Sequence, residues 1–518
     1  MATAVTDEHP KTDTERLHEL GYAQELLRKM SGFSNFAISF TIISILSGCM
    51  TAYLYAMNTG GPVVMSIGWP LVGVMVLLVG LAMAEICSSY PTAGGLYYWS
   101  AKLAQTNAPA WSWFTGWFNL LGQVGVTAGI DFGLAFFVDA FLALVFGYGT
   151  QPWNVILVYA VVLLIHGLLN TFGVRLVALL NNVSVWWHLL GVVIIVGALA
   201  IIPAHHQSVS FVFTKFVNNT GITFPGAAIY VFVIGLLMAQ YTFTGYDASA
   251  HLTEETQDAA VSGPRGIVMS ILVSLVAGWV LLLGVTFAIQ DYNAELASST
   301  GVPPAQIFID AIGWRGGLFL LLIVIGAQFF CGMSSVTANS RMIYAFSRDG
   351  ALPGSKFWHR VNKRTRTPTN SIWLAAVGAL ILGLPYLWNA TAYASVIATA
   401  VLGLYIAYII PVILRLRAGD NFKRGPWHLG RWSRPVGIIA TAWVAFITIM
   451  FVLPTVWPVT PSSFNYAIVT VLGILVFAGG WWLLGARNWF KGPRVQGTPE
   501  EMAAIERELG EVGSAAAR

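Results

Sequence analysis

Residues 240–255, QYTFTGYDASAHLTEE, contain the side chain best suited to chemistry in this sequence, the carboxylate of Asp247. The residues before it are apolar enough for a lipid bilayer. Thr244 and Gly245 weaken the helix there, because glycine lowers helix propensity by about 1 kcal/mol relative to alanine. A carboxylate inside a membrane span costs ~3 kcal/mol or more and usually serves transport or proton relay. A broken helix is tolerated in a bilayer only where its freed backbone groups line a cavity. The stretch therefore predicts a binding site near the middle of a membrane.

Two roles remain open for Asp247. The carboxylate can pair with an ammonium group of a ligand, or carry a proton between its two ionisation states. It can instead hold the helix break by accepting hydrogen bonds from backbone N–H groups.

A second interruption lies near the N-terminus. The apolar run 33–45 is followed by Leu46, Ser47 and Gly48, and apolar sequence then continues to residue 57. Two helices broken in corresponding places, five spans apart, indicate an inverted repeat of five helices each.

The composition requires a membrane. Of 518 residues, 56% are hydrophobic and only 10% are charged, whereas a soluble chain has roughly 25% charged residues. Each spanning helix needs about 20 apolar residues, so we predict an all-α membrane protein with about twelve helices. The predicted spans are 33–58, 67–88, 113–147, 153–170, 183–202, 226–250, 265–289, 315–347, 370–387, 391–415, 435–454 and 464–486.

The distribution of basic residues predicts the orientation. If both termini lie inside, 25 of the 27 Lys and Arg residues fall in segments on the cytoplasmic side of the membrane, and only Lys215 and Arg315 fall outside. Cytoplasmic segments of membrane proteins carry such an excess of basic residues. This topology explains the net charge of +4 without a nucleic acid partner. The first thirty residues are polar and predict no cleavable signal. The three cysteines lie far apart in apolar runs, so we expect no disulfide and no metal site.

Seven stretches carry a family resemblance. They are LGYAQELLRKMSGFSNFAISF (20–40), NTGGP with GWP (58–70), AEICSSYPTAGGLYYW (84–99), GQVGVTAGIDF (122–132), NNVSVWWH (181–188), FTGYDASAHLTEET (243–256) and NSRMIYAFSRDGALP (339–353). In this order they resemble the amino acid–polyamine–organocation permease superfamily, and most closely its branch of amino acid, GABA and choline permeases.

The resemblance implies two inverted five-helix repeats, as in LeuT-like folds, followed by two further helices. The implied organisation is a cytosolic tail (1–32), repeats at 33–203 and 226–416, helices 11 and 12 (435–486) and a second cytosolic tail (487–518). Substrate would lie between helices 1, 3, 6, 8 and 10.

The resemblance also assigns roles at the two breaks. Leu46, Ser47 and Gly48 occupy the place where such permeases present backbone N–H groups to a substrate carboxylate. Thr244 and Gly245 would present carbonyls to its ammonium. Tyr241 falls where relatives place an aromatic gate. The predicted substrate-binding set is Ser44, Leu46, Ser47, Gly48, Asp131, Tyr241, Phe243, Thr244, Gly245, Asp247 and Ser334.

Coupling has two candidate residues, His188 and Asp247. Some proton-coupled relatives place a lysine where this chain has His188, and histidine titrates near neutral pH. The alternative for His188 is a structural histidine with one satisfied hydrogen bond. Ser334, with Ser335 and Thr337, matches the region that builds a sodium site in other relatives, so Na⁺ remains the alternative coupling ion.

The remaining polar residues have more ordinary expected roles. Asp131 faces either the site or a helix–helix contact, and Asn119 and Gln123 are expected to bond helices together. His166 and His251 are expected to be structural. Salt bridges of an inner gate are expected for Glu85, Glu254 and Glu255.

We therefore predict a secondary active transporter of the cytoplasmic membrane, with both termini inside, that imports a small amino acid or GABA. Proton coupling is the expected mode, and no cofactor is expected. A permease for choline or another amine, or an amino acid exchanger, is the alternative. An enzyme is not indicated, because no catalytic or metal-binding motif occurs.

Overall fold

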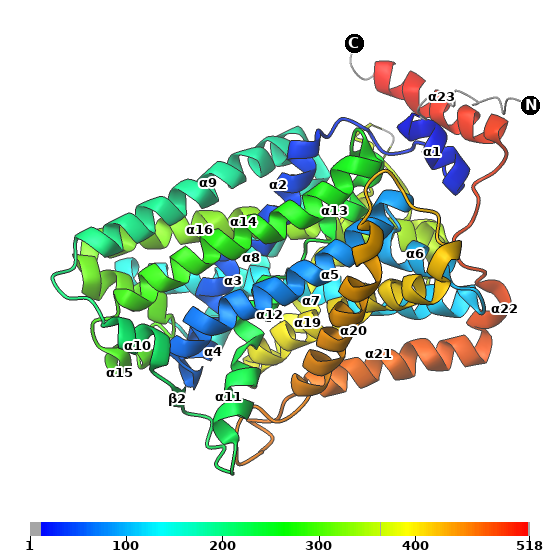
Figure 1. Cartoon of the computed structure of the whole chain (residues 1–518). Coiled ribbons are helices and arrows are strands. Elements are labelled where there is room, and N and C mark those ends of the chain that lie inside the picture. Colours follow the sequence, from blue (N-terminus) through cyan, green and yellow to red (C-terminus); the bar gives the residue numbers. More distant parts are fainter. Residues whose placement is uncertain (1–11, 173, 363, 516–518) are drawn as a thin grey trace, which may run out of the picture.

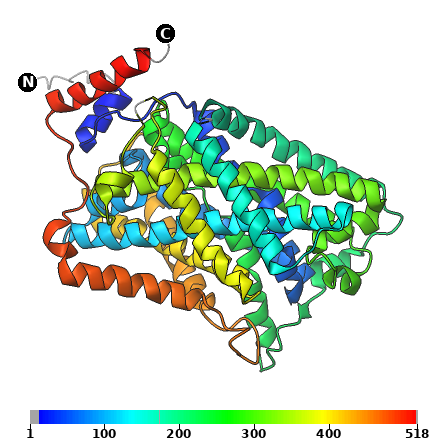
Figure 2. The ribbon, with the colours of Figure 1, turned by 180° about the vertical axis from the view of Figure 1, so that it is seen from behind.

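The computed structural model describes residues 12–172, 174–362 and 364–515, and this part of the chain forms one helical bundle (Figures 1 and 2). Eleven of its helices are long and apolar enough to cross a membrane, and the shorter apolar stretch Ala227–Thr242 adds a further candidate. The only strands in the described residues, β1 (Thr59–Gly60) and β2 (Val217–Asn218), form a short antiparallel pair. The predicted all-α fold with about twelve spans is confirmed.

The spans other than the first and the sixth overlap the predicted ranges. They are α5 (Trp69–Ser89, preceded by the π-helical turn η1, Val64–Gly68), α7 (Ala108–Phe146), α8 (Pro152–Phe172), α9 (Val174–Ile201), α14 (Ala259–Phe287), α16 (Pro303–Arg348), α18 (Thr369–Gly383, continued by η3, Leu384–Leu387), α19 (Ala392–Ala418), α20 (Ser433–Met450) and α21 (Ala467–Trp481, continued by η6, Trp482–Ala486). However, α9 begins nine residues before the predicted 183, and α16 begins twelve residues before the predicted 315 and has non-helical backbone at Gly313. The connecting elements are α6 (Gly95–Leu103), α10 (Val209–Thr214), α15 (Tyr292–Leu296), α17 (Ser355–Trp358), η4 (Gly419–Asn421), η5 (Gly430–Trp432) and α22 (Arg487–Trp489).

The first span is broken, as its sequence predicts. It consists of α2 (Gly32–Ile43), α3 (Ile45–Thr51) and α4 (Tyr53–Asn58). The break lies at Ser44, which has left-handed φ and ψ of 36° and 82°, and Leu46, Ser47 and Gly48 form the start of α3. The interruption is therefore two residues earlier than the predicted one.

The sixth span is broken at the predicted position. Helices α11 (Ala227–Gly235) and α12 (Leu237–Thr242) are followed by residues 243–247 without regular helix, then by α13 (Ala248–His251) and the 3₁₀ turn η2 (Thr253–Glu255). Gly245 has a φ of 89°, which side-chain-bearing residues rarely adopt. The glycine is therefore required at this turn.

The two broken spans meet inside the bundle. A Cβ at Gly48 of α3 would lie 2.9 Å from the Cα of Thr242 at the end of α12. Gly245 in turn packs against Ile42, just before the first break. This close contact brings both sets of interrupted backbone together.

Both tails lie at one end of the bundle. Figure 1 shows α1 (Asp13–Leu20) beside α23 (Pro499–Ala515) at that end, with α10 and α15 at the opposite end. Helix α1 stops at Leu20 because Gly21 adopts a left-handed conformation. The parts of the predicted tails at 1–11, including Lys11, and at 516–518 lie outside the described residues.

Candidate functional site

A cavity of about 690 Å³ opens at the end of the bundle opposite the tails. Its walls come from α3, α4, α7, α12 and α19, together with residues 299–303. The deepest lining residues of α3 are Met50 and Thr51, which follow Gly48 by two and three positions. The cavity therefore runs from the bundle end toward the two helix breaks.

Tyr241 of α12 lies beyond the inner end of this cavity. It is buried, and a Cβ at Gly129 of α7 would lie 2.6 Å from its hydroxyl oxygen. Tyr393 of α19 donates a hydrogen bond to the Gly129 carbonyl at 3.3 Å and also lines the cavity. These contacts set Tyr241 between the cavity and the breaks, which is compatible with the predicted gate.

Asp247 lies fully buried at the second break and has three side-chain partners. Its Oδ2 accepts from Gln123 Nε2 at 2.7 Å and lies 3.2 Å from His251 Nε2. Its Oδ1 accepts from the Tyr408 hydroxyl at 2.7 Å. These partners come from α7, α13 and α19, so one carboxylate joins three helices at the break.

The surroundings of His251 determine how it can share a proton with Asp247. Its Nδ1 lies 2.9 Å from the Ala93 carbonyl, which can only accept, so Nδ1 carries a proton. Its Nε2 lies near both the Asn119 amide, at 3.3 Å, and the Asp247 carboxylate. Neutral His251 can accept from Asn119, and protonated His251 can donate to Asp247. His251 Nε2 therefore has a hydrogen-bond partner whether or not the Asp247–His251 pair has taken up one additional proton.

Two tyrosines of α19 form hydrogen bonds with the backbone of the second break. Tyr405 donates to the Phe243 carbonyl at 2.7 Å, and the Gly245 N–H donates to the Tyr408 hydroxyl at 3.4 Å. Thr244 donates its hydroxyl proton to the Tyr241 carbonyl at 2.7 Å. The Phe243 carbonyl is thus already bonded, and its ring packs on Trp69 with centroids 4.4 Å apart.

His188 of α9 contacts the first break directly. Its Nδ1 lies 2.8 Å from the Ser184 carbonyl, and its Nε2 lies 2.7 Å from the Ser44 hydroxyl. The carbonyl requires a proton on Nδ1, so neutral His188 accepts from Ser44. A second proton would reverse that bond, because Nε2 would then donate to Ser44. The imidazole is therefore coupled to the residue whose left-handed conformation breaks the span.

Asp131 forms a buried pair with His166. The Asp131 Oδ1 lies 3.0 Å from His166 Nδ1, and both side chains are fully buried between α7 and α8. A Cβ at Gly332 of α16 would overlap both groups. Of the two predicted surroundings of Asp131, the structure gives the helix–helix contact.

The three hydroxyls of α16 point to three different helices. Ser334 donates to Asn181 at 2.5 Å, Ser335 bonds Thr127 at 2.9 Å, and Thr337 donates to Asn170 at 2.6 Å. They do not converge on one point. Among the described residues, no group of three or more His, Cys, Asp or Glu side chains could hold a metal ion.

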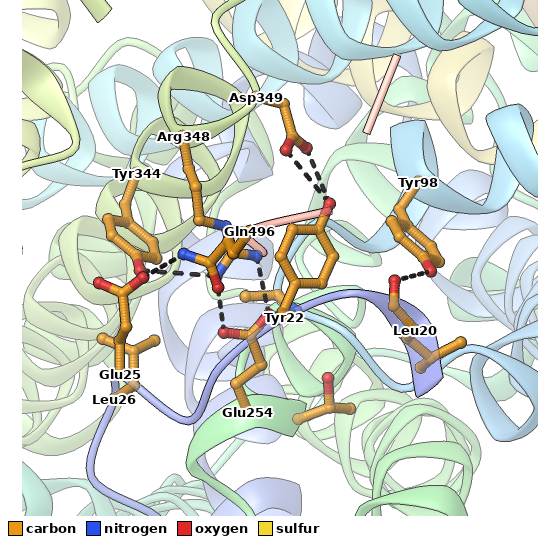
Figure 3. Close-up of polar contacts among 12 residues, drawn as sticks. Leu20, Tyr22, Glu25, Leu26, Tyr98, Glu254, Tyr344, Arg348, Asp349 and Gln496 are labelled. Carbon is orange, nitrogen blue, oxygen red and sulfur yellow. Dashed lines mark hydrogen bonds and ion pairs between the residues drawn. The ribbon is translucent and has the colours of Figure 1, made fainter. Parts of the chain in front are cut away.

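The end of the bundle near the tails is closed by ion pairs. Glu254 forms a two-pronged pair with Arg348, at 3.0 and 3.1 Å, and also accepts from the Ala93 N–H (Figure 3). Glu255 accepts from Arg341 at 2.8 Å. Glu85 lies 3.5 Å from Arg415 of α19 and accepts from Ser433 of α20. The three predicted gate acids therefore tie α5, η2, α16, α19 and α20 together.

The N-terminal segment covers this network. Tyr22 donates to Asp349 at 3.1 Å, and its ring lies 3.9 Å beneath the Arg348 guanidinium (Figure 3). Burial raises the pKa of Asp349 above its usual range, while its bonds from Tyr22, Tyr97 and the Arg494 N–H oppose that rise. Burial and the Asp349 charge also raise the pKa of Tyr22 well above its ordinary value. Tyr22 therefore stays neutral and acts as a donor.

The sequence left four important residues without a role at the site. Gln123, Tyr408 and His251 surround Asp247, and Asp139 of α7 lines the cavity. His251 stands four residues after Asp247, a spacing that places both on one helix face. Asp139 is an acid inside a predicted span, a feature that by itself indicates function. The sequence predicts that Gln123 bonds helices together but does not reveal Asp247 as its partner, and it gives no signal for Tyr408, because Asp247 lies on a distant segment.

Comparison with known proteins gives matches over most of the chain. A family model described as amino acid permease matches residues 30–476. Amino-acid permease BAT1 of Arabidopsis thaliana is 46% identical, over 92% of this chain and 95% of its own length. Its homolog in Oryza sativa subsp. japonica is 45% identical, over 93% and 95%. Amino-acid permease 2 of Neurospora crassa is 30% identical, over 95% and 91%.

Proposed function

This chain belongs to the amino acid permease family, and we propose that it imports a small amino acid, GABA among them, across the cytoplasmic membrane together with a proton. The observation that carries the proposal is the buried Asp247, which lies at a helix break and can share a proton with His251. An acid in that position can respond to both a solute and a proton.

The first break supplies a site for the substrate carboxylate. Helix α3 begins at Ile45, and the Ser47 and Gly48 N–H groups already donate to the Ser44 carbonyl, so the N–H groups of Ile45 and Leu46 are the ones that lack partners within the helix. These groups attract an anion, and Ser47 can add a hydroxyl donor. The cavity approaches this point along Met50 and Thr51. A carboxylate bound here would leave the substrate's amino group free to face α12 and α19.

Asp247 and His251 supply the proton site in this proposal. A proton taken up by the pair changes the bonds that Asp247 makes to Gln123 and Tyr408, which come from α7 and α19. His188 can transmit a second protonation to Ser44 at the other break. Protonation at either position would thus alter contacts between the broken spans and their neighbours.

The closed inner end supports alternating access. The cavity is open at one end, whereas Glu254, Glu255 and Glu85 are paired with arginines at the other. Transport requires a second state in which the outer cavity closes and these pairs separate. A ligand can drive that change only by binding the two states with different affinity.

The test is uptake into proteoliposomes that contain the full-length protein. We expect radiolabelled L-alanine or GABA to accumulate under an inward pH gradient, and not under a sodium gradient. Asp247→Asn should abolish accumulation, a loss of at least about 100-fold in initial rate. The matched control is Asp310→Asn. It removes an exposed acid near the start of α16, at the end of the bundle opposite the tails. Full uptake by Asp247→Asn would refute the central role of this residue, and uptake that needs only internal amino acid would indicate exchange.

A further inference from the structure

The cavity contains an acid that the proposed mechanism does not use. Among the described residues that line it, Asp139 is the only one with an acidic or basic side chain. Its side chain is 3% exposed, and its Oδ1 has no hydrogen-bond partner within the part of the chain that the structure describes. A buried carboxylate without a partner is costly, so the arrangement requires an explanation.

No basic side chain among the described residues that line the cavity neutralises Asp139. The bases predicted for this side of the membrane are Lys215 and Arg315, and both are exposed and absent from the cavity lining. A cation from solution is therefore the partner that would offset the cost of burying this charge.

Aromatic rings surround the same part of the cavity. Phe136, Tyr386 and Tyr393 all line it, and the Phe136 ring lies 5.5 Å from that of Tyr386 and 5.1 Å from that of Tyr393. Aromatic faces attract organic cations, whereas a hard metal ion would need several oxygen ligands around it. One carboxylate among aromatic rings therefore favours an ammonium group over a metal ion.

We propose that Asp139 forms an outer subsite for a primary ammonium group, where the amino group of the substrate binds before it reaches the helix breaks. The inference rests on the proposed function, because it assigns the first step of substrate entry. Asp139 follows Gln123, which bonds Asp247 at the second break, by 16 residues of the same helix, about 24 Å along its axis, so the subsite is separate from that break. It favours amino acids with an additional ammonium group and disfavours those with a second carboxylate.

The test uses the full-length protein in proteoliposomes and measures initial uptake of L-lysine, L-alanine and L-glutamate. The competitor is n-butylamine, which carries an ammonium group and no carboxylate. In the unmodified protein we expect n-butylamine to inhibit uptake and L-lysine to be preferred over L-glutamate. In Asp139→Asn, the KM for L-lysine and the inhibitory concentration of n-butylamine should rise about tenfold or more, with Vmax within about twofold. Asp139→Glu should retain competition, and Asp310→Asn should match the unmodified protein.

Unchanged n-butylamine inhibition in a folded Asp139→Asn variant would overturn the subsite. If that variant does not fold, Tyr386→Leu replaces it, and an unchanged inhibitory concentration there has the same meaning. Failure of n-butylamine to compete in the unmodified protein, while L-alanine uptake continues, would also overturn it. If no amino acid is taken up, the proposed function fails instead. In that case, calorimetric titration of n-butylamine into the unmodified and Asp139→Asn proteins tests the subsite independently of transport.

Discussion

The two ends of the bundle are built from opposite kinds of chemistry. In the proposed orientation, the outer end is a cavity of about 690 Å³ whose lining is mainly apolar, aromatic, hydroxylic and amide, with Asp139 as the one acid among the described lining residues. The inner end is closed by paired charges, and the N-terminal segment covers Arg348 and Asp349. Ion pairs hold the inner end, whereas none of the described residues that line the outer cavity takes part in one. The difference indicates that opening the inner end is the costly half of the transport cycle.

The same contrast describes how the broken spans act. Asp247 and His188 lie at the breaks, between the open end and the closed one. Hydrogen bonds from three helices meet at Asp247, so a change there reaches both ends. Bonds that must be broken at the inner end can be offset only by differential binding of substrate and proton.

The largest effect is expected from Arg348→Ala at the inner end. It leaves Glu254 buried and without its two-pronged partner, which typically costs ~3–5 kcal/mol. It also removes the cation above the Tyr22 ring. We expect a lower melting temperature in detergent and greater access of aqueous reagents to the inner end. The measurement is a thermal unfolding scan together with labelling of a cysteine introduced at Ala93.

The double variant Arg348→Met with Glu254→Gln is the control for that experiment. It removes both charges and should recover much of the lost stability while still loosening the inner end. Equal melting temperatures for the single variant and the unmodified protein would contradict the role of this pair. So would equal labelling of the two proteins.

A smaller effect, at the outer end, is expected from pH. Glu295 of α15 is buried, and burial raises its pKa from 4.5 to about 7. Its Oε1 accepts from the Gln290 N–H at 2.9 Å, whereas Oε2 has no partner among the described residues. An acid whose folded pKa is raised binds more protons in the folded state, so stability falls as pH rises. The melting temperature should therefore decline between about pH 4.5 and 7, by the equivalent of ~1–3 kcal/mol.

Glu295→Gln removes the titrating group and should flatten that part of the profile. Asp310→Asn removes a neighbouring charge that contributes to the raised pKa, so it should shift the profile slightly toward lower pH. A pH profile that is the same with and without the Glu295 carboxyl would contradict the assignment.

The sequence predicts the backbone of the site better than its side-chain partners. Gly245 and the apolar run before it are local signals, and the break they predict occurs where expected. The first break lies at Ser44 rather than at Leu46–Gly48, because contacts with distant His188 help to fix it. The Ser334 hydroxyl donates a hydrogen bond to Asn181, and no local sequence pattern reveals that partner.

The smallest effect is expected from Tyr22→Phe, which separates the two components of the inner closure. The ring remains to support Arg348, but the hydroxyl bonded to Asp349 is lost. A hydrogen bond to a charged group contributes ~1.5–3 kcal/mol, and Asp349 keeps its bonds from Tyr97 and the Arg494 N–H. We therefore expect a loss of only ~1–2 kcal/mol while Asp349 is charged. The Tyr22 bond favours the charged carboxylate and opposes the pKa rise that burial causes, so the loss should shrink as pH falls and Asp349 becomes protonated. Thermal unfolding scans of the Tyr22→Phe variant and the unmodified protein from pH 5 to 8 measure this loss of stability. A loss that does not depend on pH would mean that Tyr22 acts through packing alone.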